Sequence, residues 1–115
     1  MSHWLLQHDP ARGDCGDGDW TVRRYRDRIA EGDEVALWHS GRAGGVVALG
    51  VIVAAPHETP GGTVVGVRFD RRQSIPRADL KADDRFRQAL ILRMPAGGNP
   101  FPLGPGEWKA ITDRL

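Results

Sequence analysis

The pattern of hydrophobic and polar positions, with apolar runs between turn-forming residues, predicts β-structure in four segments: 2–8, 34–39, 45–54 and 63–71. The last segment alternates most regularly, with Val65, Val67 and Phe69 on one face of the strand. The third segment is nearly all apolar, so we expect a strand that is buried on both faces. A sheet of at least four strands is therefore the predicted framework.

Three further segments have the spacing of an amphipathic helix: 21–30, 83–92 and 106–115. In the first, Val22, Tyr25 and Ile29 share one face, and Gly32 is placed to end the helix. In the third, the side chains expected to face the core are Trp108, Ile111 and Leu115. Turn-forming residues dominate the segments predicted to be loops or turns: 9–19, 56–62 and 95–105.

Several strands with helices towards one side are typical of an α+β fold, here a small β-barrel with flanking helices. The chain has 115 residues, and no internal repeat or linker divides it, so we expect one domain over residues 1–115. Hydrophobic residues make up 40% and charged residues 27% of the chain, as in an ordinary globular domain. No apolar run approaches the roughly 20 residues of a membrane-spanning helix.

The sequence offers few signs of an enzyme. The only cysteine, Cys15, lies in an acidic, glycine-rich loop that disfavours a thiolate nucleophile. The histidines lack the spacing of a zinc site, and no phosphate-binding glycine loop is present. We therefore expect no catalytic residue, no metal and no cofactor. The lone cysteine and the lack of a recognisable signal peptide favour a cytoplasmic protein.

Two tryptophans stand beside polar residues, and together they suggest a pocket for a flat ring. Trp20 follows the polar loop and precedes the predicted helix, an unusual place for a tryptophan that serves only the core. Trp38 ends a strand and is followed by His39 and Ser40, which can donate or accept hydrogen bonds. Trp38 is equally consistent with the barrel core. The aromatic residues assigned to the core are Trp4, Trp108, Phe69 and Phe86.

The net charge is only +1, but the arginines gather in two segments. One segment contains Arg23 and Arg24, and the other contains Arg68, Arg71 and Arg72. If both segments faced one side, they would attract phosphate groups. A solvated surface, partly neutralised by nearby aspartates, explains the same arginines slightly better.

Segments spread in order over nearly the whole chain resemble those of a known family. They are Trp4-Leu5-Leu6, Trp20-Thr21-Val22-Arg23-Arg24-Tyr25, Gly32-Asp33-Glu34-Val35-Ala36-Leu37-Trp38-His39-Ser40-Gly41, Gly45-Val46-Val47-Ala48-Leu49-Gly50, Val65-Gly66-Val67-Arg68-Phe69, Asn99-Pro100-Phe101-Pro102-Leu103 and Glu107-Trp108. In this order the chain resembles an EVE domain, a member of the PUA-like superfamily and a relative of the YTH domains.

The resemblance implies a non-catalytic reader of nucleic acid. EVE domains are PUA-like barrels whose pocket takes a modified base flipped out of DNA or RNA, such as 5-methylcytosine, 5-hydroxymethylcytosine or N6-methyladenine. The implied base pocket consists of Trp20, Thr21, Val22, Trp38, His39 and Ser40. The implied phosphate contacts are Arg23, Arg24, Arg68, Arg71 and Arg72.

The resemblance also implies a partner, because similar bacterial domains accompany modification-dependent restriction endonucleases. One departure concerns Arg24, which stands where some relatives carry asparagine. Two alternative functions stay open: a small hydrolase on the same barrel, and a protein-interaction module. Hydrolases of the related ASCH branch use a lysine and a glutamate, whereas Lys81 and Lys109 lie here on elements predicted to be exposed and outside the pocket.

Overall fold

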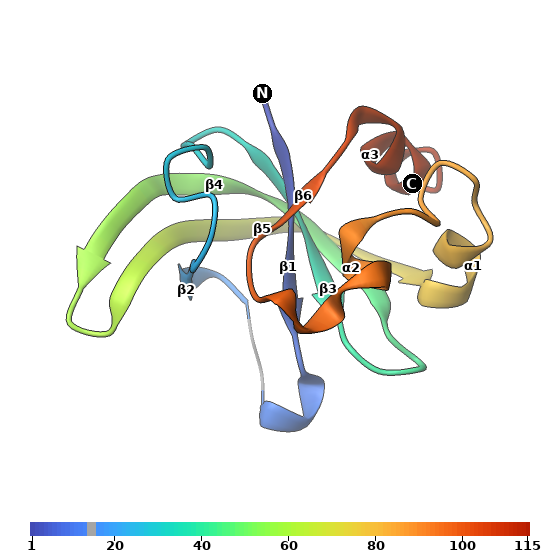
Figure 1. Cartoon of the computed structure of the whole chain (residues 1–115), viewed down its shortest axis with the longest axis horizontal. Coiled ribbons are helices and arrows are strands. Elements are labelled where there is room, and N and C mark those ends of the chain that lie inside the picture. Colours follow the sequence, from blue (N-terminus) through green and yellow to red (C-terminus); the bar gives the residue numbers. More distant parts are fainter. Residues whose placement is uncertain (14–15) are drawn as a thin grey trace.

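The structure is a computed structural model that describes residues 1–13 and 16–115. Within those residues, six strands form one sheet and short helices pack beside it (Figure 1). The strands are β1 (His3–His8), β2 (Gly18–Thr21), β3 (Glu34–His39), β4 (Gly45–Thr59), β5 (Gly62–Pro76) and β6 (Phe101–Leu103). The helices are α1 (Arg77–Lys81), α2 (Leu90–Arg93) and α3 (Pro105–Thr112), with 3₁₀ turns η1 (Pro10–Arg12) and η2 (Pro95–Gly97).

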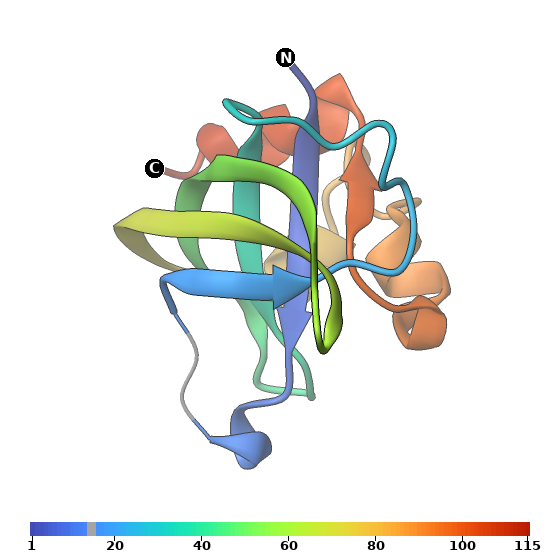
Figure 2. The same ribbon diagram turned by 90° about the vertical axis from the view of Figure 1, so that its left-hand side faces the viewer.

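The strand order is β2-β5-β4-β3-β1-β6, with β1 and β3 parallel and all other neighbours antiparallel. β2 and β6 are therefore edges, and the predicted closure into a barrel is wrong. Both edge strands are short, with four residues in β2 and three in β6, and they do not pair with each other. The sheet instead curves strongly along β4 and β5 (Figure 2), and the segment between β2 and β3 covers the open side.

The two faces of the sheet carry separate core clusters, because side chains alternate along each strand. We call the face that carries Trp4 and Leu6 the inner face. Its cluster contains Trp4, Leu6, Val22, Ile29, Val35, Ile52, Val65 and Val67. The outer face packs against the helices, and its cluster includes Leu5, Trp38, Phe86 and Ile111. The predicted burial of Trp4 and Phe86 is confirmed.

Residues 21–30 do not form the predicted helix. β2 ends inside this range, and the Val22 N–H extends the ladder by donating to the Thr63 carbonyl over 3.0 Å. Tyr25 has φ +57°, a left-handed conformation that a helix does not contain. Val22 and Ile29 are still buried on the inner face. The helical spacing thus marked a buried loop: Thr21 and Val22 pair with β5, and further on the N–H groups of residues 28 and 29 both donate to the Tyr25 carbonyl in a single turn.

The β4–β5 hairpin is longer than predicted. β4 runs on to Thr59, so the predicted turn over 56–62 is mostly strand. A register shift around Pro56 lets the ladder continue past a residue that has no N–H to donate. The far half of β4 is also less buried than expected, since Val53 is 42% exposed.

The predicted helix over 83–92 is replaced by a series of turns. The Phe86 N–H donates to the Asp83 carbonyl and the Ala89 N–H to the Phe86 carbonyl, and α2 begins only at Leu90. These successive bonds between residues three apart bury Phe86 and Ala89 without forming an α-helix. The predicted loop over 95–105 is also wrong in part, because it contains β6.

The C-terminal helix is confirmed, although it ends earlier than predicted. Ile111 is buried as expected, but Leu115 lies beyond the helix and is 48% exposed. Trp108 is half-buried and stacks on His3, with ring centroids 4.5 Å apart. Across residues 1–13 and 16–115, no helix is long and apolar enough to cross a membrane.

A buried carboxylate ties the N-terminus to the start of β3. Asp33 accepts hydrogen bonds from Trp4 Nε1 at 2.9 Å, the Ala30 N–H at 3.0 Å and the Ser2 N–H at 3.2 Å. Burial by itself raises the pKa of Asp33, but these N–H groups outweigh it and hold the pKa below its ordinary value of 3.8. Gly32 precedes it at φ +92°, a conformation that favours glycine. The Gly-Asp pair therefore closes one end of the inner cluster.

Candidate functional site

A cleft opens at the end of the inner face opposite Asp33, where β1 and β3 finish. We call this the open end of the inner face, and the end filled by the inner cluster the closed end. The cleft has two lobes that share a wall of Gln7, His8 and Asn99. The Trp20 lobe, about 500 Å³, is lined further by Gly16, Asp17, Asp19, Trp20 and Thr21. The Ser40 lobe, about 410 Å³, is lined further by Arg12, Ser40, Gly98 and Phe101, among others.

Trp20 is held by its neighbours but is not buried in the core. Its Nε1–H donates to the Gly16 carbonyl over 2.9 Å. Its ring makes edge contacts with Phe69 at 5.9 Å and with His8 at 6.3 Å between centroids. The side chain is half-buried, so it has a fixed orientation and still borders the cleft. A ring placed in this way can stack on a planar ligand without a large loss of side-chain entropy.

Two histidines lie beside each other at the open end, and one of them, His8, contacts Trp20. His8 and His39 are register partners in β1 and β3, and their rings lie 6.0 Å apart. Burial, and then repulsion from His8, lower the pKa of His39 below its ordinary 6.5. His8 Nε2 lies 2.7 Å from the Gly13 carbonyl, which can only accept, so His8 Nε2–H is the donor of this hydrogen bond.

The structure brings together some of the residues that the sequence assigned to a base pocket. Thr21 lines the Trp20 lobe, and Ser40 lines the other lobe while its N–H donates to the His8 carbonyl over 3.0 Å. Val22 is buried at 1% exposure in the inner cluster. Trp38 lies on the outer face at 3% exposure, and its ring stacks on Phe86 with centroids 6.1 Å apart. Val22, Trp38 and His39 do not line the cleft, although the His39 ring lies 6.0 Å from that of His8, which does.

The arginines assigned to phosphate contacts also differ from one another. Arg23, Arg68, Arg71 and Arg72 are exposed. Arg71 and Arg72 line a hollow of about 420 Å³ that shares Gly16 and Asp17 with the Trp20 lobe.

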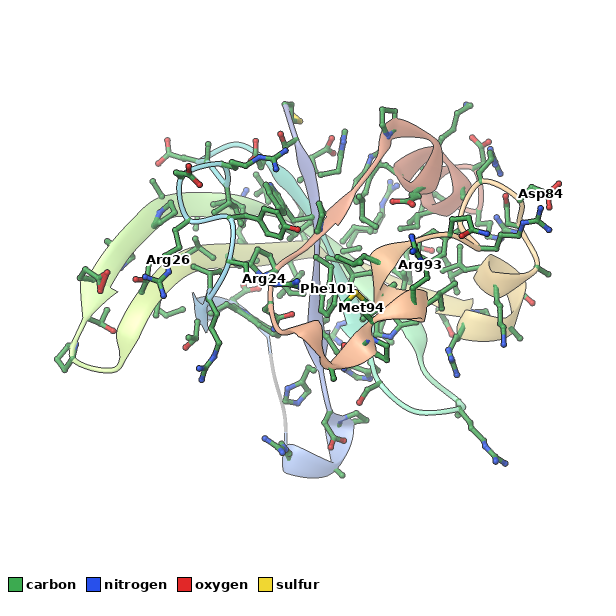
Figure 3. All side chains as sticks on the ribbon, in the orientation of Figure 1. Arg24, Arg26, Asp84, Arg93, Met94 and Phe101 are labelled. Carbon is green, nitrogen blue, oxygen red and sulfur yellow. The ribbon has the colours of Figure 1, made fainter. Side chains whose placement is uncertain are left out.

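Arg24 stands apart from the other arginines because it is half-buried. Its Nη2–H donates to the Gly98 carbonyl over 2.7 Å. Its guanidinium carbon lies 5.3 Å from the centre of the Phe101 ring and 5.5 Å from that of Tyr25 (Figure 3). Arg24 is therefore packed against Gly98 and Phe101, two residues that line the Ser40 lobe.

Gln7 and Asn99 are site residues that sequence reasoning missed. Asn99 Oδ1 accepts from the Gln7 N–H over 2.7 Å, and Asn99 Nδ2 donates to the Gln7 carbonyl over 3.0 Å. The Asn99 side chain, just before the start of β6, thus makes the hydrogen bonds to the Gln7 backbone that a paired strand would make. Gln7 Oε1 is buried, and no group in the described part of the chain donates to it. No local pattern signals this pairing, because the two residues are 92 positions apart.

Two kinds of catalytic group bear on an enzymatic role among the described residues: metal ligands and a lysine in the cleft. Among residues 1–13 and 16–115, no three His, Cys, Asp or Glu side chains gather as metal ligands would. Lys81 in α1 and Lys109 in α3 are both exposed, and neither lines the cleft. Cys15 lies outside the described residues.

Solved structures of low sequence identity share this arrangement. A hypothetical protein from Leishmania major is similar at a TM-score of 0.82 and 19% identity, covering 99% of this chain and 94% of that chain. A protein from Pseudomonas syringae is similar at 0.79 and 21% identity, covering 99% and 100%. The human THYN1 protein, solved in complex with DNA that contains 5-methylcytosine, is similar at 0.77 and 18% identity, covering 99% and 97%. The chain has the fold of these proteins.

The DUF55 domain of human thymocyte nuclear protein 1 is a further structural neighbour, at a TM-score of 0.72 and 19% identity. These neighbours share the open α+β fold of the chain, and the EVE-type, PUA-like assignment stays a prediction. At such identities the likeness concerns the fold alone, and the relation to YTH domains stays a prediction. No family model and no curated protein sequence matches the chain.

Proposed function

We propose that the chain is a non-catalytic reader that accommodates a modified base in the cleft at the open end of the inner face. The observation that carries the proposal is the position of Trp20, a half-buried ring whose orientation is fixed at the edge of a polar cleft. A structural neighbour bound to 5-methylcytosine DNA supports it, because the two chains share one fold.

The chemistry of the cleft suits a base taken out of its stack. Extrusion costs a few kcal/mol, and stacking on an aromatic side chain returns about 1–3 kcal/mol per base. Trp20 provides the stacking surface. Thr21 and Ser40 line the cleft and supply hydrogen-bonding groups for the base edge or the sugar, and His39, beside His8, is a further candidate.

Phosphate contacts are assigned to exposed arginines around the cleft. Arg23 follows the Trp20 lobe along the chain, Arg71 and Arg72 line the adjoining hollow, and Arg68 lies nearby on β5. Arg12 is a further candidate, because its side chain is 84% exposed at the Ser40 lobe and its described partner, Asp9, is 3.9 Å away. These side chains give affinity for the strand and not for the modification.

The proposal is tested by titrating labelled oligonucleotides that differ in one base. DNA and RNA strands of identical sequence carry cytosine, 5-methylcytosine, 5-hydroxymethylcytosine, adenine or N6-methyladenine, all at one stated salt concentration. We expect tighter binding to at least one modified strand than to its plain counterpart. We also expect Ser40→Ala or His39→Ala to narrow that difference. Equal binding to every strand by the unaltered protein would reject the reader function.

A modification-dependent restriction endonuclease remains a proposed partner. A reader without catalytic groups needs an attached or associated enzyme to act on the strand that it selects. Pull-down from cells of the protein's own source, with the Trp20→Ala variant as control, separates association through nucleic acid from direct protein contact. A nuclease that is retained by both forms binds the protein itself.

A further inference from the structure

Arg24 differs from the other arginines that surround the cleft in how its charged group is used. Its Nη2–H donates to the Gly98 carbonyl at 2.7 Å, and its guanidinium lies over the rings of Phe101 and Tyr25. Its Nε is buried, with no acceptor among the described residues. In Figure 3, Arg24 lies beside Phe101 in the middle of the view. Arg26 lies further to the left, away from Phe101.

The loop beneath Arg24 is shaped to receive it. A Cβ added at Gly97 would lie 3.0 Å from Arg24 Nη2 and 3.2 Å from Nη1, so the guanidinium packs directly on the glycine backbone. The neighbouring segment supplies a second contact, because the Arg23 N–H donates to the Asn99 carbonyl over 3.0 Å. Arg23 and Arg24 together therefore hold the carbonyls of two consecutive residues, Gly98 and Asn99.

These contacts lead directly to the wall shared by the two lobes. Asn99 uses both ends of its side-chain amide on the backbone of Gln7, at 2.7 and 3.0 Å. Gln7 and Asn99 line both lobes of the cleft. A shift of the Gly98–Asn99 backbone would move the Asn99 amide, and with it the end of β1 that carries Gln7.

We propose that Arg24 is a positioning residue that fixes the Gly98–Asn99 wall, and that it makes no phosphate contact. This inference rests on the proposed function and replaces the phosphate role that the sequence assigned to Arg24. A phosphate contact needs a guanidinium that faces solvent, as in Arg23. The Arg24 guanidinium is instead committed to a carbonyl and two aromatic rings, an arrangement that a lysine ammonium cannot reproduce.

The two roles give opposite results in salt titrations. The variants are Arg24→Ala and Arg24→Lys, with the exposed Arg26→Ala as the matched control, and the probes are single strands carrying either one 5-methylcytosine or one cytosine. Loss of a phosphate contact lowers the slope of log affinity against log salt by roughly 0.7, equally for both strands. Loss of positioning leaves that slope unchanged and reduces the preference for the modified strand, by roughly fivefold for the equivalent of one hydrogen bond.

Lysine distinguishes the roles further. It keeps the positive charge, so it should preserve a phosphate contact, but it should fail to restore a preference that depends on the planar guanidinium. We expect Arg24→Lys to resemble Arg24→Ala, and Arg26→Ala to keep the full preference. A lower salt slope in Arg24→Ala, restored by lysine, would overturn the positioning role.

A measurement without nucleic acid keeps this inference separate from the proposed function. The side-chain NH₂ of Asn99 should exchange slowly with solvent in the unaltered protein, since Nδ2 is bonded to the Gln7 carbonyl. Both Arg24 variants should speed that exchange, and Arg26→Ala should not. Unchanged exchange in folded Arg24→Lys would refute the inference even if the protein reads modified bases. If the Arg24 variants exchange faster but the unaltered protein shows no preference for modified strands, the positioning role is retained and only the reader function is rejected.

Discussion

The closed and open ends of the inner face are built on the same strands but carry different side chains. Along β1, Trp4 and Leu6 are 2% and 0% exposed in the inner cluster. Two residues further, on the same face, His8 is half-buried beside Trp20 and His39. Alternation therefore decides which face a side chain occupies, and polarity near the strand end decides whether that face becomes core or cleft.

The two ends should consequently respond to different kinds of perturbation. The closed end is stabilised by apolar burial and by the bonds to Asp33. The open end is held by ring contacts and by side-chain bonds to backbone, as from Asn99 to Gln7. Substitutions at the closed end should lower stability, whereas those at the open end should lower affinity with little loss of stability.

The largest difference in stability is expected between substitutions at two inner-face positions of β1, two residues apart. Leu6→Ala should lower the free energy of unfolding by about 2–5 kcal/mol, because it leaves a cavity in a filled cluster. His8→Ala should lower it by roughly 1 kcal/mol or less, since the ring is half-buried at a cleft. Urea unfolding followed by circular dichroism measures both. Equal destabilisation by the two substitutions would remove the distinction between the ends.

Tryptophans on opposite faces provide the next test. Trp20→Ala should weaken binding to every base that the cleft accepts, by roughly 1–3 kcal/mol. Trp38→Phe should lower stability through its outer-face packing on Phe86 and leave affinity unchanged. Oligonucleotide titrations at one salt concentration, on variants that still unfold cooperatively, measure the pair. Comparable losses of affinity in both variants would place Trp38 at the site after all.

The closed end should also show a dependence on acid that Asp33 controls. Its pKa is held below the ordinary 3.8 in the folded protein, so its stabilising effect is present above that value and is lost as the pH falls through the folded pKa. The stability difference between the unaltered protein and Asp33→Asn should therefore be greatest near neutral pH and shrink below about pH 3.8. Asp84→Asn, at an exposed position, is the control. A difference that stays constant with pH would contradict this role.

The smallest effect is expected from single arginines around the open end. Arg71→Gln should lower the salt slope of binding by roughly 0.7–0.9 and leave the preference for a modified base unchanged. Arg87→Gln is a suitable control, because Arg87 pairs with Asp84 at 3.4 Å and lines neither lobe of the cleft. An altered preference in Arg71→Gln would show that this side chain contacts the base.

Much of the sheet follows from local pattern, because alternation is a property of consecutive residues. The strand around Val65 was predicted for that reason and the one around Val35 from its apolar run, and both residues are buried on the inner face. The helix predicted through Tyr25 was wrong because three apolar positions at helical spacing also fit a loop that covers a sheet. The left-handed conformation of Tyr25 depends on distant partners that no short window contains.

The candidate site was accessible from the sequence only in part. Trp20 stood out because polar residues surround it, and it does border the cleft. Trp38 and His39 are consecutive in β3, so period two alone indicated that they face opposite sides of the sheet. The Gln7–Asn99 pairing had no sequence signal, since it joins backbone groups to a side chain 92 positions away.

The four tryptophans allow the central claim to be tested in one titration, because each occupies a different part of the fold. Trp4 is at the closed end, Trp20 in the cleft, Trp38 on the outer face and Trp108 beside His3. Their indole N–H signals can be followed by NMR while a 5-methylcytosine oligonucleotide is added. We expect the Trp20 signal to shift most, with the other three nearly unchanged. A dominant shift of Trp108, or none at Trp20 on binding, would contradict the account.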